Sequence, residues 1–498
     1  MTPGFPTLQA PRTFKVLLFL FGIYGLALVL IFFLLFTGII NLAKGDPFNI
    51  IIAIGCLFSV AIILYSLFPP FDKFQPPGIK MTSKEAPRLF NEIHQTAALL
   101  GQTLPENLYL LLDFDTYIIR RGGILGIGSH RIAAIGVPLL AALNVAQFRA
   151  IFAHELAHYK KTQAPLSPLV YTLRLICIHT LSRIDVHDWK KSPLRYVLKT
   201  FVKMSQPIAE YQELVADQAA AGISGVQVFS KAMGIIYGAM TAFQAYMQQE
   251  FFTVIEAGYR PPLFDGFAQY LRTPAVSTVM EHLVSRSMLE KSRDPFDAHA
   301  SLMDRLNAIA PFTSQHQEDD RSTPAIDLLD HLPDLERKLL EFQYGKKALQ
   351  TWKPIPWEGV GRSVYLPVWK STLRKIGEGL QGVTPETIPD LLNNPDPLWV
   401  LLKGGSSAPM SKEELRGGVI NITGMALATA LADRGWQIIT PPGDLITLQL
   451  GDDVIQPFAV VSRLAAGVLS PFEWQRICRE TGITGIPLGT TGTNSTRV

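Results

Sequence analysis

Two long segments without charged residues stand near the start of the chain. Residues 16–40 contain no Asp, Glu, Lys or Arg over 25 positions, and residues 49–68 contain none over a further 20. A helix of about 20 residues is long enough to cross the roughly 30 Å of bilayer hydrocarbon. Only eight residues separate the two segments, and Pro69-Pro70 ends the second. The pattern therefore predicts a transmembrane hairpin of two helices, forming a first domain of residues 1–75.

A cleaved signal peptide is the alternative interpretation of the first segment. Signal peptides have an apolar stretch of about 7 to 15 residues and end in an A-x-A-like cleavage site. The first segment of this chain is longer than that and has no such site after it. We therefore favour a retained spanning helix.

Basic residues are distributed unequally around this hairpin. Both outer flanks are basic, whereas the connecting loop carries one lysine beside one aspartate. The flanking residues are Arg12, Lys15, Lys73, Lys80, Lys84 and Arg88, and the loop residues are Lys44 and Asp46. Lys and Arg accumulate on the cytoplasmic side of membrane proteins. The distribution predicts a multi-pass integral membrane protein in which both ends of the hairpin, and the domains that follow it, face the cytosol.

Helical periodicity dominates the next part of the chain. Short alternating stretches predict strands at residues 108–112, 117–119 and 131–137, and helices follow between about residues 144 and 310. Residues 314–325 are polar and charged, with no large apolar side chain, which is typical of a linker.

The remaining residues predict a second, smaller α+β region. Residues 326–344 have helical spacing, and strands are expected at residues 437–440, 445–449 and 455–461. The chain is therefore expected to be mainly α and to contain two domains after the hairpin, residues 76–313 and 326–498.

Composition excludes several classes of protein. Of the 498 residues, 48% are hydrophobic and 17% charged, which is too apolar for intrinsic disorder. A net charge of +3 is too small to indicate nucleic acid as a partner. The three cysteines are far apart and form no C-x-x-C motif, so neither a disulfide framework nor a thiolate zinc site is expected.

One predicted helix contains a motif with metal chemistry. Residues 145–161 read VAQFRAIFAHELAHYKK and follow Asn144, a suitable N-cap. His154 and His158 are four residues apart, so both project from one face of the helix and can share one zinc ion. Glu155 lies beside them, where it can act as the general base that activates water. The spacing is typical of zinc hydrolases.

A hydrolytic zinc ion needs a third protein ligand and one open position for water. The metzincin pattern requires Gly and His three and six residues after His158, where this chain has Lys161 and Ala164. That class is excluded. A glutamate on another helix is the alternative, and Glu213 is the candidate, with Glu210 on nearly the same helical face as its rival.

The helix of Glu213 is expected to begin at Pro207 and to end at Gly222. Asp217 lies one turn after Glu213 on the same face. It is placed to accept the free N–H group of a ligating histidine and so to fix that ring's orientation.

Three motifs together resemble a family of integral-membrane zinc metallopeptidases, which includes the HtpX-type bacterial quality-control peptidases and the CAAX prenyl proteases. HELAH at residues 154–158 and ELVAD at residues 213–217 are similar to its two signature motifs, and DPFDAHASLMDRL at residues 294–306 is similar to a third. The resemblance implies that His299 and Arg305 position the substrate or stabilise the oxyanion. It covers roughly residues 87–310 and departs from the family in lacking the usual upstream asparagine.

These observations predict a mainly α membrane protein with an N-terminal two-helix transmembrane hairpin, a zincin-like α+β metallopeptidase domain and a small α+β C-terminal domain. The expected activity is that of a membrane-anchored zinc endopeptidase with one Zn²⁺ per chain, acting on proteins or peptides in quality control. The substrate is expected to lie along the strand at residues 131–137. A processing enzyme for one peptide or prenylated substrate, and an idle scaffold with structural zinc, are the alternatives. The partners are thus substrate and lipid bilayer, without nucleic acid, and the oligomeric state is open.

Overall fold

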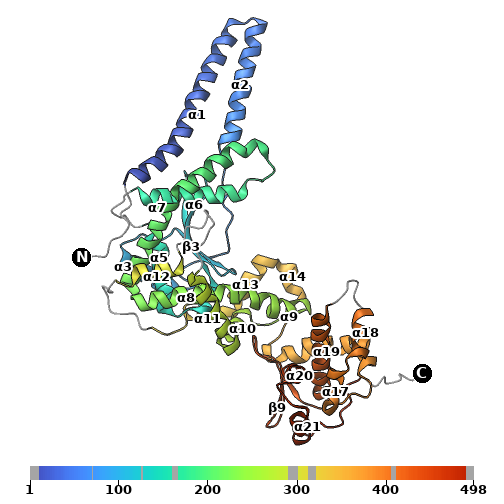
Figure 1. Ribbon diagram of the computed structural model, residues 1–498. Coiled ribbons are helices and arrows are strands. Elements are labelled where there is room, and N and C mark those ends of the chain that lie inside the picture. The colour runs from blue at the N-terminus through green and yellow to red at the C-terminus, as the bar shows by residue number, and fades with distance from the viewer. Residues whose placement is uncertain are drawn as a thin grey trace. The chain divides into compact units, whose positions relative to one another are not determined.

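The computed structural model describes residues 10–69, 71–124, 127–159, 166–289, 301–311, 321–404 and 411–489. These residues form two compact units. The first unit comprises residues 1–241 and 279–345, and the second comprises residues 242–278 and 346–498. Helices make up most of both units, which confirms the prediction of a mainly α protein (Figure 1).

The two predicted spanning segments form a helical hairpin. Helix α1 (Ala10–Lys44) and helix α2 (Pro47–Leu67) lie side by side and extend away from the other helices of the first unit (Figure 1). The turn is set locally, because the Asp46 side chain accepts a hydrogen bond from the Asn49 N–H group at 3.1 Å and Pro47 occupies the first turn of α2.

Among the described residues, three helices are long and apolar enough to cross a membrane: α1, α2 and α19 (Lys412–Ala432). The hairpin helices expose large apolar side chains along their length, such as Phe32 and Phe48. Helix α19 is more than half buried inside the second unit, as a core helix is. The hairpin therefore has the character of a membrane segment.

A four-stranded mixed sheet supports the centre of the first unit. Its order is β1 (Ile79–Met81), β2 (Asn107–Leu111), β4 (His130–Gly136) and β3 (Thr116–Arg121). Strand β4 pairs parallel with β2 and antiparallel with β3. The expectation that a substrate pairs with residues 131–137 is therefore wrong, because both edges of β4 already carry hydrogen-bonded neighbours. The outermost strand on that side is β3.

Helices α3 (Pro87–Leu100), α5 (Val145–Ala157), α6 (Ser167–Arg183) and α7 (Ser192–Ser224) build the core beside this sheet. As predicted, Asn144 caps α5: its side chain accepts a hydrogen bond from the Gln147 N–H group, and the Gln147 side chain accepts one from the Asn144 N–H group. Phe148, Phe152 and Leu156 are fully buried. Helix α5 is thus held rigidly inside the unit.

The predicted bounds of the Glu213 helix are wrong at both ends. Pro207 lies inside α7 instead of starting it, and the helix ends at Ser224, followed by Gly225, whose φ angle of +93° is readily available only to glycine. The fully buried Arg174 donates hydrogen bonds to the Val202 carbonyl and the Ser205 hydroxyl, just before the proline. Arg174 thus joins α6 to the part of α7 that precedes the proline.

The predicted linker, residues 314–325, lies partly outside the described residues. Its described end is bonded to the first unit: the Arg321 guanidinium donates to Glu92 on α3, and the Ala325 N–H group donates to the Leu143 carbonyl. The helix that follows belongs to the first unit. The two units divide the chain elsewhere, near residues 241, 278 and 345.

The remaining helices of the first unit are short or are shared with the second unit. They are α4 (Val137–Ala142), α12 (Leu302–Ile309), η3 (Ala325–Leu328) and α13 (Leu332–Tyr344), together with the three-residue turn η1 (Trp189–Lys191). Helices α8 (Val226–Tyr246) and α11 (Pro274–Leu289) contribute residues to both units.

The second unit has its own apolar core, which includes Trp369, Trp436 and Trp474. Its antiparallel sheet has the order β7 (Gln437–Ile439), β8 (Thr447–Leu450) and β9 (Asp453–Ile455). The third predicted strand is only partly right, because Pro457 starts a helix there. The other elements are η2 (Met247–Phe251), α9 (Phe252–Glu256), β5 (Tyr259–Arg260), α10 (Leu263–Arg272), α14 (Lys346–Thr351), β6 (Lys353–Pro354), α15 (Trp357–Val360), η4 (Gly361–Tyr365), α16 (Leu366–Ile376), η5 (Gly377–Leu380), η6 (Pro385–Thr387), α17 (Ile388–Asn393), α18 (Asp396–Gly404), α20 (Pro457–Ala465) and α21 (Pro471–Glu480).

Candidate metal centre and catalytic site

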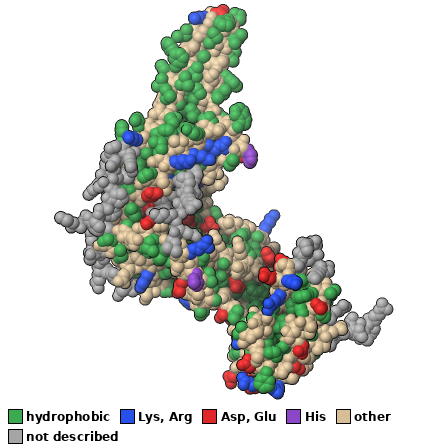
Figure 2. Space-filling view, viewed as in Figure 1, with side chains coloured by type: hydrophobic (Ala, Val, Ile, Leu, Met, Phe, Trp, Pro, Cys, Tyr) green, Lys and Arg blue, Asp and Glu red, His purple; other side chains and the backbone are tan. Residues whose placement is uncertain are grey.

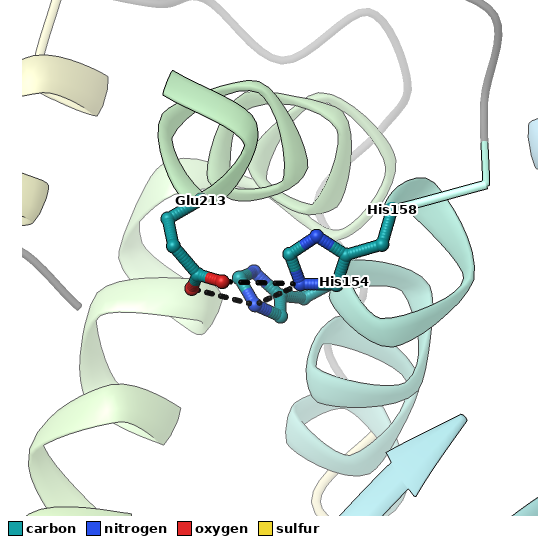
Figure 3. Close-up of side chains that lie close together, drawn as sticks. All are labelled: His154, His158 and Glu213. Carbon is teal, nitrogen blue, oxygen red and sulfur yellow. Dashed lines mark hydrogen bonds and ion pairs between the residues drawn. The ribbon is translucent and has the colours of Figure 1, made fainter. Parts of the chain in front are cut away.

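The three residues predicted as metal ligands meet between two helices (Figure 3). His154 and His158 come from the end of α5, and Glu213 comes from the middle of α7. The two Nε2 atoms are 3.2 Å apart; that of His154 lies 3.5 Å from Oε2 of Glu213, and that of His158 lies 3.4 Å from Oε1. All three side chains are buried. Among the described residues, this is the cluster that can hold a metal ion.

The donor separations fit a zinc ion. Nitrogen and oxygen ligands lie about 2.0 to 2.2 Å from zinc, so neighbouring donors in a tetrahedral site are about 3.3 Å apart. The separation of 3.2 Å between the two Nε2 atoms matches this spacing, and each Nε2 atom has one oxygen of the Glu213 carboxylate at 3.4 or 3.5 Å. The rival ligand Glu210 is exposed and accepts a hydrogen bond from Gln206, outside the cluster.

Two buried charged side chains, Asp217 and Arg305, orient His154. Asp217 lies with its Oδ1 atom 2.9 Å from Nδ1 of His154, as predicted for an orienting carboxylate. The guanidinium of Arg305, on α12, donates to both Asp217 oxygens at 2.6 and 2.8 Å. Burial raises the pKa of Asp217, but the charge and hydrogen bonds of Arg305 and His154 outweigh burial and keep it below its ordinary value. Asp217 is therefore an ionised acceptor.

The resemblance implies a place near the active site for Arg305, and the structure shows which groups it contacts there. Its guanidinium is directed at Asp217, and its Nη2 atom is 3.8 Å from Glu213. Ser301 starts α12 by accepting a hydrogen bond from the Asp304 N–H group, and the helix buries Arg305 together with Leu302 and Ile309.

His299, the other residue implied by the family resemblance, lies outside the described residues. Its proposed action on the substrate therefore stays a prediction.

Replacing Arg305 by Met is expected to destabilise the metal-free protein by about 3 to 5 kcal/mol, because the buried Asp217 carboxylate would lose its charged partner. Arg88→Met is the matched control. Arg88 pairs with Asp330 at 2.6 Å, but its side chain is 56% exposed, so a change within about 1 kcal/mol is expected. Thermal unfolding of both variants in detergent measures the difference. Equal stability losses would contradict a special role of the buried pair.

Tyr171, on α6, is a further member of the centre that the sequence gave no reason to select. Its hydroxyl donates to Oε1 of Glu213 at 3.1 Å and lies 3.4 Å from Nε2 of His158. Its ring stacks on the His158 ring, with centroids 4.4 Å apart and an interplanar angle of 9°. Burial, followed by the charges of Glu213 and Glu155, raises the pKa of Tyr171 well above its ordinary value, so the hydroxyl remains a donor.

Tyr171→Phe is expected to weaken zinc binding by roughly 10 to 100-fold, the usual cost of losing a partner that orients a ligand. The stacked ring is retained in this variant, so the change isolates the hydroxyl group. Tyr159→Phe is the control, because the Tyr159 hydroxyl donates to the Ile118 carbonyl of β3 at 2.7 Å instead of to a ligand. Competition with a chelator measures both affinities, and an unchanged affinity in Tyr171→Phe would remove the hydroxyl from the centre.

Glu155 follows the first histidine and is half-buried. Its charge acts on the hydroxyl groups of both Tyr159 and Tyr171, since it contributes to raising the pKa of each, after burial as the largest cause. The site therefore combines three metal donors with a carboxylate that water can reach.

Comparison with known proteins agrees with this geometry. Residues 124–311 match the profile of peptidase family M48, the family of HtpX-type and CAAX zinc metallopeptidases. The matched region contains the two histidines, Glu155, Glu213 and Arg305. Searches of curated proteins and of solved structures gave no match. The match confirms the resemblance seen in the motifs: residues 124–311 are similar to the zinc metallopeptidases of family M48.

Proposed function

We propose that this chain is a membrane-anchored zinc endopeptidase in which Glu155 is the general base. One observation carries the proposal: the buried side chains of His154, His158 and Glu213 each offer one donor atom within 4.8 Å of the others, and the half-buried carboxylate of Glu155 directly follows the first histidine on α5. A purely structural zinc site is normally closed by four protein ligands, whereas a catalytic site has three and keeps one position open. The donor set supports the catalytic kind.

The chain's own residues perform the proton transfers. A zinc ion held by the three ligands would polarise the scissile carbonyl and make water acidic enough to lose a proton near neutral pH. Glu155 accepts that proton as the water oxygen bonds to the carbonyl carbon, and then delivers it to the amine nitrogen as the C–N bond breaks. Asp217 and Tyr171 keep the ligands oriented throughout, through their contacts with His154 and Glu213.

An extended substrate fits best along β3, the outermost strand beside the metal helix. Backbone pairing with a strand edge holds a peptide without requiring one particular sequence. The contact between Tyr159 and Ile118 ties this strand to the end of α5, and so to the metal ligands. Such tolerance supports a role in protein quality control.

We further propose that α1 and α2 both cross the membrane and that the active site faces the cytosol. The support is the length and apolar surface of the two helices and the basic residues on both outer flanks. Reporters fused near Arg12 and after Lys84 should score as cytosolic, and one inserted at Lys44 should score on the opposite side. Any other pattern would contradict this topology.

The activity is tested with the full chain in detergent and an unfolded protein as substrate. One zinc ion per chain and cleavage at several sites are expected, with activity lost on chelation and restored by Zn²⁺. Cleavage of one peptide or prenylated substrate only would favour the processing enzyme. Bound zinc without any hydrolysis would favour the idle scaffold.

A further inference from the structure

The turn between α6 and α7 exposes a group of apolar and aromatic side chains. Val186, Trp189 and Tyr196 are 77%, 76% and 71% exposed. Large apolar and aromatic side chains are usually buried. A group of them exposed at the turn between α6 and α7 therefore indicates a contact surface. We call this turn with the first half of α7, residues 183–203, the juxtamembrane surface.

This surface is bonded to the end of the second spanning helix. The Lys191 ammonium group donates to the carbonyls of Tyr65 and Phe68, and it lies 4.2 Å above the Tyr65 ring. The Tyr65 hydroxyl donates to Asp188 at 3.1 Å. Phe68 is the last residue of the uncharged segment. The turn therefore lies at the depth where the apolar part of α2 ends.

Helix α7 has two different faces along this surface. Leu194, Leu198 and Phe201 are buried in a cluster that includes Leu17 and Leu20 at the base of α1. The exposed residues in this part of the helix include one aromatic and two basic side chains: Tyr196, Lys199 and Lys203. The buried face of α7 thus packs against the hairpin, and the exposed face does not take part in that packing.

The charge of the juxtamembrane surface is strongly positive. Residues 183–203 contain six lysine or arginine residues against two aspartates. Figure 2 shows Lys and Arg side chains gathered just below the hairpin, next to hydrophobic ones. Several of the charges are exposed and directed to the outside: Lys190, Lys199 and Lys203. The rest of the chain has almost no net charge, so this concentration is local.

We infer that the juxtamembrane surface binds the anionic phospholipid surface of the bilayer that holds the hairpin. Trp and Tyr are enriched at membrane interfaces, where the ring is apolar and the polar atom meets water. Lysines beside a membrane segment are attracted to anionic headgroups. The bonds to Tyr65 and Phe68 hold both kinds of side chain at the required depth. This inference rests on the proposed insertion of the hairpin.

Helix α7 carries residues of both the juxtamembrane surface and the metal centre, so it connects the two. Tyr196 and Glu213 are 17 residues apart on α7, which corresponds to about 26 Å along a helix. The metal centre therefore lies at most about that far outside the headgroup layer. Such a distance suits cleavage of polypeptide segments just outside the bilayer, rather than within it.

Trp189 provides a direct test, because the other six tryptophans all belong to the second unit. The full chain is reconstituted in liposomes of phosphatidylcholine, with or without phosphatidylglycerol, using lipids brominated near the headgroup to quench tryptophan emission. We expect quenching that disappears in Trp189→Phe, persists in the control Trp352→Phe and is greater with phosphatidylglycerol. In the triple variant Lys190→Gln, Lys199→Gln and Lys203→Gln, the additional quenching with phosphatidylglycerol should be lost.

Alkaline carbonate extraction of the same liposomes tests the insertion of the hairpin separately from the lipid contact of the juxtamembrane surface. If the protein resists extraction but Trp189 is not quenched, the juxtamembrane surface faces something other than lipid and this inference is overturned alone. If the protein is released, the inserted hairpin and this inference are overturned together. Quenching that is equal with and without phosphatidylglycerol would refute the anionic preference.

Discussion

Glu155→Gln is expected to reduce peptide hydrolysis by roughly 10² to 10⁴-fold while the bound zinc remains unchanged. The amide has nearly the same size and shape as the carboxylate, but it does not accept a proton. The three candidate metal ligands are untouched, because the cluster that can hold the ion consists of His154, His158 and Glu213. The measurement is kcat on an unfolded protein substrate, with zinc content determined on the same preparation.

Glu210→Gln is the matched control for this result. Glu210 is an exposed glutamate on α7, three residues before a metal ligand, and it accepts a hydrogen bond only from the Gln206 side chain among the contacts described. Its replacement should leave kcat and zinc content unchanged. Activity of Glu155→Gln equal to that of the control would rule out Glu155 as the general base.

The second large effect is expected for Glu213→Ala, which should lose zinc and with it all zinc-dependent hydrolysis. Removing a group that only orients a ligand costs about 10 to 100-fold in metal affinity, so the loss of a ligand itself should exceed 100-fold. His154 and His158 would remain, with their Nε2 atoms 3.2 Å apart, and two imidazoles alone hold zinc weakly. Metal analysis after dialysis measures the loss.

Glu210→Ala distinguishes the two glutamates. It should retain zinc and activity, since its side chain is exposed on α7 and lies outside the ligand cluster. If Glu210→Ala loses zinc and Glu213→Ala keeps it, the assignment of the third ligand is reversed. The comparison also controls for helix stability, because both substitutions replace a glutamate by alanine within one turn of the same helix.

Local parts of the site could be predicted from the sequence because they depend on one helix only. Two histidines four residues apart on an α-helix share a face wherever that helix is placed, so His154 and His158 were paired by spacing alone. The Asn144 cap and the two uncharged segments of the hairpin are local in the same sense. Each depends on residues within a few turns of one another.

Other features needed the packing of distant segments. Tyr171 reaches Glu213 only because α6 folds back against α7, and neither its residue type nor its neighbours mark it in an apolar helix. The pairing order of the sheet likewise depends on long-range contacts. Strand β4, residues 130–136, has the apolar sequence of a strand, but only the register with β2 and β3 shows that it lies inside the sheet.

The sequence by itself predicted the class of the protein: a hairpin of two apolar helices, a histidine pair with metal-ligand spacing beside a glutamate, and a further glutamate on a later helix as the third ligand. Only the tertiary structure decided which glutamate meets the histidines and what Arg305 contacts. Glu210 and Glu213 are three residues apart, so their side chains differ by only about 60° around the helix, and spacing does not distinguish them. The rotation of α7 against α5 does, because it buries one carboxylate beside two imidazoles and leaves the other in water.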